Sequence, residues 1–258
     1  RTTHAHHRNG EGFFQLIVRA GDPRPQHPLR MNIAVVGTGY VGLVTGTCFA
    51  ETGNHVICVD IDANKVQMMK DGKVPIYEPH LDVLFERNIR QGRLSFTTDL
   101  VSAIKDAQII FLALPTPPGE DGSADLKYVL GVADDLGKII TDYKVIVDKS
   151  TVPVGTAEKV HAAVAKHAKV DFDIVRNPEV LREGFAVEDF MKPDRIVIGT
   201  ESPKATEKMK MLYEPFVRQG NPILIMDRAS AEVTKYAANS YLAMRITFMN
   251  ELANFCEK

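Results

Sequence analysis

The sequence has few cysteines, little net charge and no long apolar run, and each shortage excludes a class of protein. Its three cysteines, Cys48, Cys58 and Cys256, show neither a disulfide nor a metal-site spacing, so we expect no metal and a reducing, cytoplasmic setting. A formal net charge of −2 gives no electrostatic reason to expect nucleic acid or a membrane surface as a partner. The apolar runs are far shorter than the ~20 residues that a membrane span needs. With 258 residues, 45% of them hydrophobic, the chain is typical of a globular protein.

The first 30 residues lack methionine, since Met31 is the first methionine of the chain. They carry five arginines, a proline-rich stretch at 22–28 and few acidic residues. A disordered extension or an over-extended start fits this composition. A targeting peptide is the alternative because the segment is basic, although the apolar run at 13–18 is too short for a secretory signal.

A glycine-rich motif, Gly37-Thr38-Gly39-Tyr40-Val41-Gly42, lies between an apolar run, Asn32–Val36, and an amphipathic segment, Leu43–Thr52. The order strand, glycine turn, helix is the context in which G-x-G-x-x-G predicts a dinucleotide phosphate site. The helix N-terminus there supplies N–H donors and the positive end of a dipole. A turn that serves packing alone is the alternative. The residues that we predict to contact the cofactor here are Gly37, Gly39, Tyr40, Val41 and Gly42.

The next predicted strand, His55–Val59, ends in Asp60. This position is close to the ~20-residue offset at which a carboxylate receives the adenosine ribose hydroxyls of a dinucleotide. A carboxylate would repel a 2′-phosphate, and no arginine follows until Arg87, so the sequence favours NAD over NADP. Lys65 could reach the ribose or a phosphate, or could be a solvated lysine.

Strands alternate with helices along the rest of the chain. The fold class that we predict is therefore α/β, a doubly wound Rossmann-like parallel sheet of about eight strands followed by a long inter-domain helix. The further strands are expected at 95–98, 108–114, 144–148, 172–175, 195–199 and 222–226. The helices are expected at 64–71, 80–91, 100–105, 125–141, 156–169, 203–217 and 230–258.

Polar residues follow several of these strands at the edge that faces the ligand crevice of a doubly wound sheet. Thr116 follows strand 108–114 and is a candidate for hydrogen bonding to NAD. The segment 149–155, which contains Ser150 and Thr151, follows strand 144–148. In the loop 176–184, Glu179 and Glu183 would share a face if the loop begins a helix.

From Ser230 to Lys258 the chain contains neither glycine nor proline, which predicts one helix about 43 Å long. It is apolar nearly all round, so we expect other elements to bury it, and we expect the chain to be truncated within it. Lys235 and Asn239 are spaced i, i+4 and project from one face. They could form an oxyanion site; a polar stripe on a solvated helix is the alternative.

Six motifs together resemble those of the UDP-glucose/GDP-mannose dehydrogenase family, and they occur in the family's order between residues 31 and 258. The bacterial UDP-glucose branch of that family is the most similar. The motifs are Gly37-x-Gly39-x-x-Gly42-Leu43, Pro115–Pro118 with Gly122–Leu126, Lys149–Gly155, Asn177–Gly184, Arg195–Gly199 and Glu232–Asn239.

The resemblance implies oxidation of the C6 hydroxymethyl of UDP-glucose to a carboxylate with two NAD. It implies that Thr116, Ser150, Thr151 and Glu183 contact the cofactor. The catalytic residues it implies are Glu179 as acid/base, Thr151 as a residue that places water, and Lys235 with Asn239 at the oxyanion. The substrate contacts it implies are Glu179, Val180, Leu181, Arg182, Glu183, Lys235 and Asn239.

The chain departs from the family where the second oxidation needs a nucleophilic cysteine. The family's Gly-Gly-Ser-Cys-Phe-Pro-Lys-Asp stretch is absent, and so is the C-terminal sugar-nucleotide domain. GDP-mannose and UDP-N-acetylhexosamine sugars remain open as substrates, and so does an NAD-binding module without turnover. The division that we expect is an extension at 1–30, an NAD-binding domain at 31–228 and the start of a central domain at 229–258. The resemblance also implies a homodimer formed through the helix at 230–258.

Overall fold

The computed structural model of the chain describes residues 30–119, 123–178, 181–218 and 220–257. The extension expected at 1–30 lies outside them apart from Arg30. Eight strands form one sheet in the order β3-β2-β1-β4-β5-β6-β7-β8. The sequence predicted the ends of each strand to within about two residues, and the doubly wound α/β class is confirmed. The strands are β1 (Asn32–Val36), β2 (His55–Val59), β3 (Leu94–Thr97), β4 (Ile109–Leu112), β5 (Lys144–Asp148), β6 (Phe172–Arg176), β7 (Ile196–Gly199) and β8 (Ile223–Met226).

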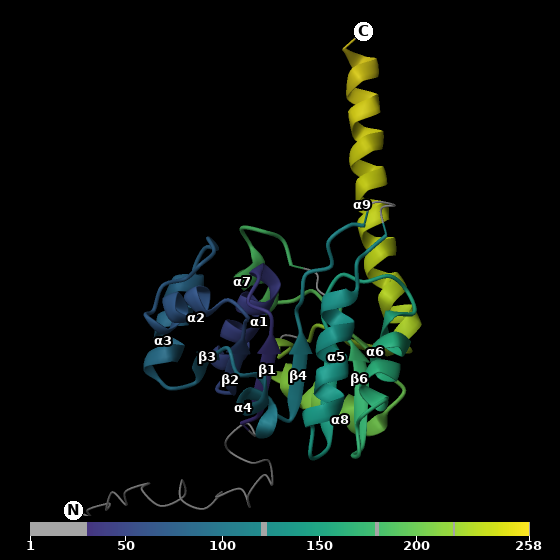
Figure 1. The fold of residues 1–258 in the computed structure, drawn as a ribbon. Helices are drawn as coiled ribbons and strands as arrows, with labels where there is room; N and C mark the ends of the chain where they lie inside the picture. The colour runs from purple at the N-terminus through teal and green to yellow at the C-terminus, as the bar shows by residue number, and fades with distance from the viewer. Residues whose placement is uncertain (1–29, 120–122, 179–180, 219, 258) are drawn as a thin grey trace, which may run out of the picture.

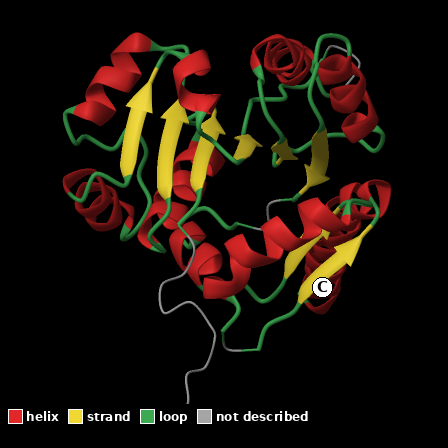
Figure 2. Ribbon diagram, turned by 90° about the horizontal axis from the view of Figure 1, so that it is seen from below, coloured by secondary structure: helices red, strands yellow, loops and turns green. Residues whose placement is uncertain are grey.

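Helices cover both faces of this sheet (Figures 1 and 2). The short helix α7 was not predicted, and the others differ from their expected bounds mainly at their ends. The helices are α1 (Tyr40–Glu51), α2 (Ala63–Lys70), α3 (Leu81–Arg90), α4 (Leu100–Lys105), α5 (Lys127–Ile139), α6 (Thr156–Ala165), α7 (Ala186–Met191), α8 (Pro203–Tyr213), the 3-10 helix η1 (Glu214–Phe216) and α9 (Arg228–Cys256).

The core divides into two layers because successive side chains of a strand point to opposite faces. In β1, Ile33 and Val35 belong to the core cluster that includes residues of α1, α2, α3, α7 and α8, whereas Ala34 and Val36 belong to the cluster that includes residues of α4, α5 and α6. β4 and β5 are buried at every residue, as expected of parallel strands covered on both faces.

One pairing corrects the prediction of a wholly parallel sheet. β6 and β7 are antiparallel and meet through the single pair Arg176 and Gly199, whereas β7 and β8 are again parallel. The helix between these two strands, α7, packs on α1. It does not form the crossover along β6 and β7 that a parallel pair needs.

Helix α9 begins directly after β8 and extends away from the other described elements (Figure 1). Its buried residues are Ala231, Glu232 and Lys235, all within its first two turns. The expected burial by other elements is therefore limited to these turns. The exposed apolar side chains further along it include Tyr241, Leu242, Met244, Ile246, Phe248 and Met249. None of the described helices, α9 included, combines the length and the hydropathy that crossing a membrane requires.

Candidate functional site

The carboxyl ends of β1, β2, β4 and β5 border a cavity of about 600 Å³. This volume lies within the range of small-molecule and cofactor sites, and parallel sheets bind their ligands at this edge. Most of the residues predicted to contact the cofactor line it, whereas Tyr40, Gly42 and Glu183 do not. The predicted residues that line the cavity are Gly37, Gly39, Val41, Asp60, Lys65, Thr116, Ser150 and Thr151.

Two glycines of the turn, Gly37 and Gly42, have no room for a side chain, whereas the third, Gly39, has open space beside it. A Cβ on Gly37 would lie 2.3 Å from the carbonyl oxygen of Ala113, and one on Gly42 would lie 2.0 Å from that of Gly37. Gly37 also has a φ of +99°, which favours glycine. Gly39 precedes α1, and a Cβ there would meet no described atom within 4 Å. The main chain at Gly39 is thus open to a ligand, and the site fits a pyrophosphate at the helix N-terminus.

Asp60 carries a carboxylate at the end of β2 that several donors hold in place. Its Oδ2 accepts from Thr38 N at 3.1 Å, from the Thr38 hydroxyl and from Lys65 Nζ at 3.1 Å, and its Oδ1 accepts from Asp62 N. Partial burial raises the pKa of Asp60, but the hydrogen bonds from Thr38, Asp62 and Lys65 outweigh it and lower the pKa overall. The group is therefore an anionic acceptor, as recognition of ribose hydroxyls requires. Thr38 was not singled out, although it lies inside the motif.

The side chain of Tyr40 points away from this cavity. Its hydroxyl donates to Glu78 and accepts from Gly184 N at 3.1 Å. Burial and the hydrogen bond to Glu78 raise the pKa of Tyr40 to about 12. The buried Glu78, which the sequence did not reveal, thereby connects the start of α1 to the loop before α7.

The far end of the cavity brings three predicted residues together. Thr116 Oγ1 donates to the carbonyl oxygen of Thr151 at 2.7 Å, and Lys235 Nζ donates to Thr151 Oγ1 at 2.7 Å. Lys235 comes from α9, 84 residues further along the chain. A cation and a hydroxyl thus lie side by side next to the predicted cofactor site, an arrangement that can stabilise negative charge on an oxygen.

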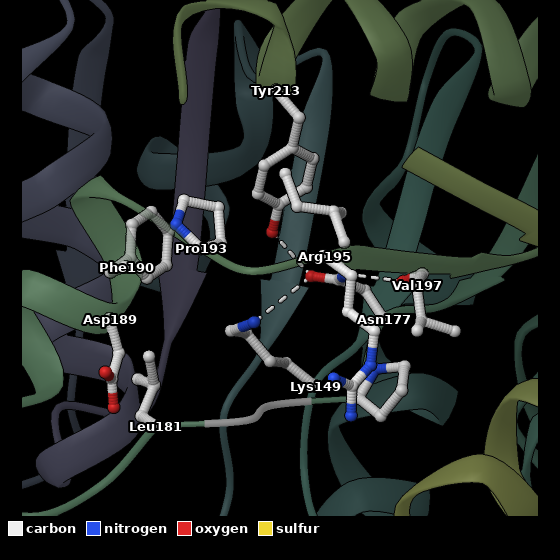
Figure 3. A pocket seen from close by; sticks show the side chains of 11 residues that line it. Lys149, Asn177, Leu181, Asp189, Phe190, Pro193, Arg195, Val197 and Tyr213 are labelled. Atoms are coloured by element: carbon white, nitrogen blue, oxygen red, sulfur yellow. Dashed lines mark hydrogen bonds between the residues drawn. The ribbon is translucent and has the colours of Figure 1, made fainter. Parts of the chain in front are cut away.

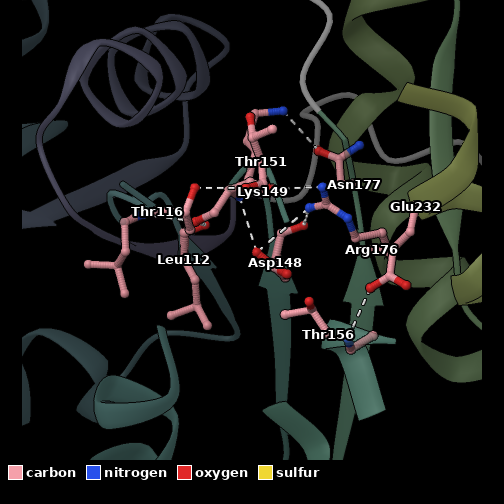
Figure 4. Close-up of polar contacts among 12 residues, drawn as sticks. Leu112, Thr116, Asp148, Lys149, Thr151, Thr156, Arg176, Asn177 and Glu232 are labelled. Atoms are coloured by element: carbon pink, nitrogen blue, oxygen red, sulfur yellow. Dashed lines mark hydrogen bonds and ion pairs between the residues drawn. The ribbon is translucent and has the colours of Figure 1, made fainter. Parts of the chain in front are cut away.

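Buried charges shape the loop that carries Thr151 (Figure 4). Arg176 Nη1 and Nη2 donate to the carbonyl oxygens of Asp148 and Ser150, each at 2.6 Å. Asp148 Oδ1 accepts from Ser150 N at 3.1 Å. Burial raises the pKa of Asp148 to about 6, although Arg176 and the Ser150 amide act to lower it. The sequence did not single out Arg176 or Asp148, because the spacing of residues does not reveal such buried partners.

Among the described residues, the predicted Asn239 and Glu183 do not line this cavity. Asn239 is exposed on α9, one turn beyond Lys235. Glu183 is exposed in the turn before α7, which begins at Ala186, so the helical face expected for Glu179 and Glu183 is not found. Glu179 and Val180 themselves lie outside the described residues.

The neighbours of Glu183 have structural partners. Arg182 Nη2 donates to Asp189 Oδ1 at 2.7 Å. Leu181 lines a small cavity of about 30 Å³ (Figure 3), where Asn177 Oδ1 accepts from Lys149 Nζ at 3.1 Å and from Tyr213 OH at 2.6 Å. That volume is enough for a water molecule.

Two cysteines belong to the core. Cys48 and Cys58 are buried, and burial raises the pKa of the Cys58 thiol to about 12. Cys256 is exposed at the end of α9. Within the part of the chain that the structure describes, no three His, Cys, Asp or Glu side chains gather as a metal site would require.

Comparison with known proteins identifies the class to which this fold and site belong. Residues 31–217 match the model of the NAD binding domain of the UDP-glucose/GDP-mannose dehydrogenase family, and residues 229–258 match the model of its central domain. The chain belongs to that family, and NAD is confirmed as the cofactor of its sheet domain.

Individual relatives agree with this assignment. The chain is 50% identical over 228 residues to UDP-glucose 6-dehydrogenase TuaD of Bacillus subtilis, covering 88% of this chain and 49% of the relative. It is 46% identical over 231 residues to UDP-glucose 6-dehydrogenase of Pseudomonas aeruginosa, covering 88% of this chain and 51% of the relative. The chain therefore spans about half the length of the curated relatives it matches.

Solved structures give the same result. A UDP-glucose dehydrogenase from Pyrobaculum islandicum superposes with a TM-score of 0.84 at 41% identity, covering 88% of this chain and 53% of that one. A ternary complex of GDP-mannose dehydrogenase from Pseudomonas aeruginosa superposes with a TM-score of 0.79 at 34% identity, covering 86% of this chain and 52% of that one.

Proposed function

We propose that this chain supplies the cofactor half of an NAD-dependent 6-dehydrogenase that oxidises the C6 hydroxymethyl of UDP-glucose to the carboxylate of UDP-glucuronate. One observation supports it most. A single cavity extends from the glycine turn and Asp60 to Thr116 and Thr151, and the Lys235 ammonium lies at Thr151. The names of the relatives support UDP-glucose as the sugar nucleotide.

In this proposal the cofactor lies along the cavity. The main chain at Gly39 receives the pyrophosphate, the Asp60 carboxylate receives the adenosine ribose, and Lys65 adds a cation beside it. Thr116, Ser150 and Thr151 border the nicotinamide end. NAD, when bound, supplies the hydride acceptor, and the protein positions the sugar's C6 against it.

The protein's own chemistry is centred on Lys235. Its ammonium stabilises the negative charge that develops on the C6 oxygen, as preorganised donors do in other enzymes. Thr151, within hydrogen-bond distance of that ammonium, positions a water molecule. Glu179 serves as acid/base, and Asn239 joins the oxyanion site when substrate draws the two sides together. The loop 181–183 contacts the sugar nucleotide.

The second oxidation requires a thiol that this chain does not offer at the site. Cys48 and Cys58 are buried in the core. Cys256 lies 17 residues beyond Asn239, or about 25 Å along the helix axis. This observation favours a second candidate function for the isolated polypeptide, an NAD-binding module without turnover. GDP-mannose and UDP-N-acetylhexosamines are the alternative sugar nucleotides.

We further propose that residues 31–228 form the NAD-binding domain, that 229–258 begin a central helical domain in the cytoplasmic enzyme, and that α9 mediates a homodimer. The exposed apolar side chains of α9 support the last point. Light scattering at tens of micromolar tests it, and a monodisperse monomer would contradict it.

Calorimetric titration with NAD tests the cofactor site. Asp60→Asn removes the anionic acceptor, so we expect NAD affinity to fall about tenfold or more, the effect of losing hydrogen bonds to a charged group. Asp106→Asn, an exposed aspartate at the end of α4, is the matched control and should bind NAD like the parent. Equal affinity in all three proteins would refute our assignment of Asp60.

The choice of sugar is tested by following NADH formation with a panel of nucleotide sugars, using the longest protein that contains this chain. Turnover with UDP-glucose supports the leading proposal. Turnover with another sugar alone supports that alternative, and binding of NAD without any turnover supports the binding module.

A further inference from the structure

Helix α9 is joined to the sheet domain by a buried carboxylate. Glu232 is fully buried, its Oε2 accepts from Gly155 N at 2.7 Å and its Oε1 accepts from Ala157 N at 3.0 Å. Both amides belong to the start of α6. The N-cap residue of this helix is Gly155, which has no side chain with which to cap it. Glu232 therefore supplies the N-terminal acceptor of α6 from another helix, where the helix dipole favours a negative charge.

Close packing holds the same turn of α9 against β7. A Cβ on Gly199 would lie 2.5 Å from the Cβ of Ala231 and 3.0 Å from the Cα of Arg228. The first residues of α9 thus contact the strand main chain directly. Glu232 supplies the polar part of this attachment, and its two oxygens fix both the height and the rotation of α9 relative to α6.

Lys235 lies three residues after Glu232 and hence on the same side of α9. Its Nζ donates to Thr151 Oγ1 at 2.7 Å. The short segment 151–157 is therefore held from α9 at both ends, by Lys235 at Thr151 and by Glu232 at Gly155 and Ala157. Figure 4 shows Glu232 beside Thr156 at the start of α6. A rotation of α9 that broke the Glu232 contacts would also move the ammonium away from Thr151.

We propose that Glu232 is a positioning residue for the reaction, which keeps the Lys235 ammonium against Thr151 by capping α6 from α9. The inference rests on the proposed function only for the chemical role of Lys235. The contact itself can be measured without turnover.

The test compares Glu232→Ala and Glu232→Gln with the parent chain. The readout is the rate at which an amine-directed acetylating reagent modifies Lys235, followed by peptide mass spectrometry on folded protein. The exposed Lys159 of α6 is the internal reference. We expect the Lys235 to Lys159 ratio to rise about tenfold in Glu232→Ala, because charge-assisted hydrogen bonds that fix α9 are lost. Glu232→Gln keeps one acceptor and should show a smaller rise.

Glu251→Gln is the matched control, since it removes a carboxylate from an exposed position of the same helix and should leave the ratio unchanged. A ratio within twofold of the parent in a folded Glu232→Ala variant would overturn the proposal. So would an equal acceleration at Lys159, which would mean that Glu232 only stabilises the fold. If the alanine variant does not fold, the glutamine variant decides by the same ratio.

NAD titration of the same proteins separates this inference from the proposed function. Failure of the parent to bind NAD would refute the proposed function and leave the labelling result valid. A parent that binds NAD while its variants show no change in the ratio would refute the positioning role alone.

Discussion

Two loops border the same cavity and are held in place in different ways. The turn 37–42 is fixed by its own main chain, since glycine is needed where a Cβ would collide with a carbonyl oxygen. The loop 148–155 is fixed by buried charged side chains that come from β6 and α9. In the proposed function, the first loop binds the cofactor by its shape and its amides. The second places functional side chains, and it depends on charges that need partners.

The largest expected effect concerns Arg176, which holds the second loop. Arg176→Met would leave two carbonyl oxygens and the Asp148 carboxylate buried without this donor, so we expect a loss of about 3–5 kcal/mol in the free energy of unfolding. Urea denaturation measures it. Arg90→Met, at a side chain that is 72% exposed, should change stability by less than about 0.5 kcal/mol. A loss below about 1 kcal/mol for Arg176→Met would show that buried charge does not hold this loop.

The second prediction concerns pH. An Asp148 pKa of about 6, above the ~3.9 of an unfolded aspartate, means that the folded protein binds the extra proton between these values. The raised pKa of Asp148 therefore adds to the free energy of unfolding below about pH 4. This stabilisation, about 3 kcal/mol, is lost as the pH rises through 6. Asp148→Asn cannot titrate and keeps an acceptor for Ser150 N. The stability of the parent relative to this variant should therefore fall between pH 4 and pH 7. Urea denaturation measures the difference in stability between the two proteins, and a difference that does not change between pH 4 and pH 7 would contradict the prediction.

The smallest effect concerns the glycine turn. Gly42→Ala forces a methyl group to within 2.0 Å of a carbonyl oxygen, and we expect a loss of about 1–3 kcal/mol and weaker NAD binding. Gly131→Ala, in α5, is the matched control. Its added Cβ meets no described atom within 4 Å, so the change should stabilise the helix by up to about 1 kcal/mol. Thermal unfolding and NAD titration distinguish the two, and equal behaviour would mean that the turn tolerates a side chain.

The same contrast explains what the sequence could predict. All eight strands and the cofactor turn follow from local patterns, because apolar runs and glycine spacing act through neighbouring residues. The antiparallel β7 did not follow, since the direction of a strand depends on where the connecting helix packs, and α7 packs on α1. Lys235 could be placed on α9 from its spacing, whereas its contact with Thr151 requires the packing of α9. The buried contacts of Arg176, Glu78 and Glu232 were not predicted, although Glu232 lies in one of the six motifs, because a buried charge has no local pattern and is recognised by its distant partners. The roles of Glu179, Glu183 and Asn239 stay predictions.

The attachment of α9 has a consequence for the order in which the site forms. Thr38 meets Asp60 across 22 residues of chain, whereas Glu232 meets Gly155 across 77 and Lys235 meets Thr151 across 84. Closing a longer loop costs more chain entropy, and contacts between distant residues form slowly during folding. We therefore expect the contact between Thr38 and Asp60 to form earlier during folding than the contacts of α9 with segment 151–157. The ribose acceptor would then be in place before the Lys235 ammonium reaches Thr151.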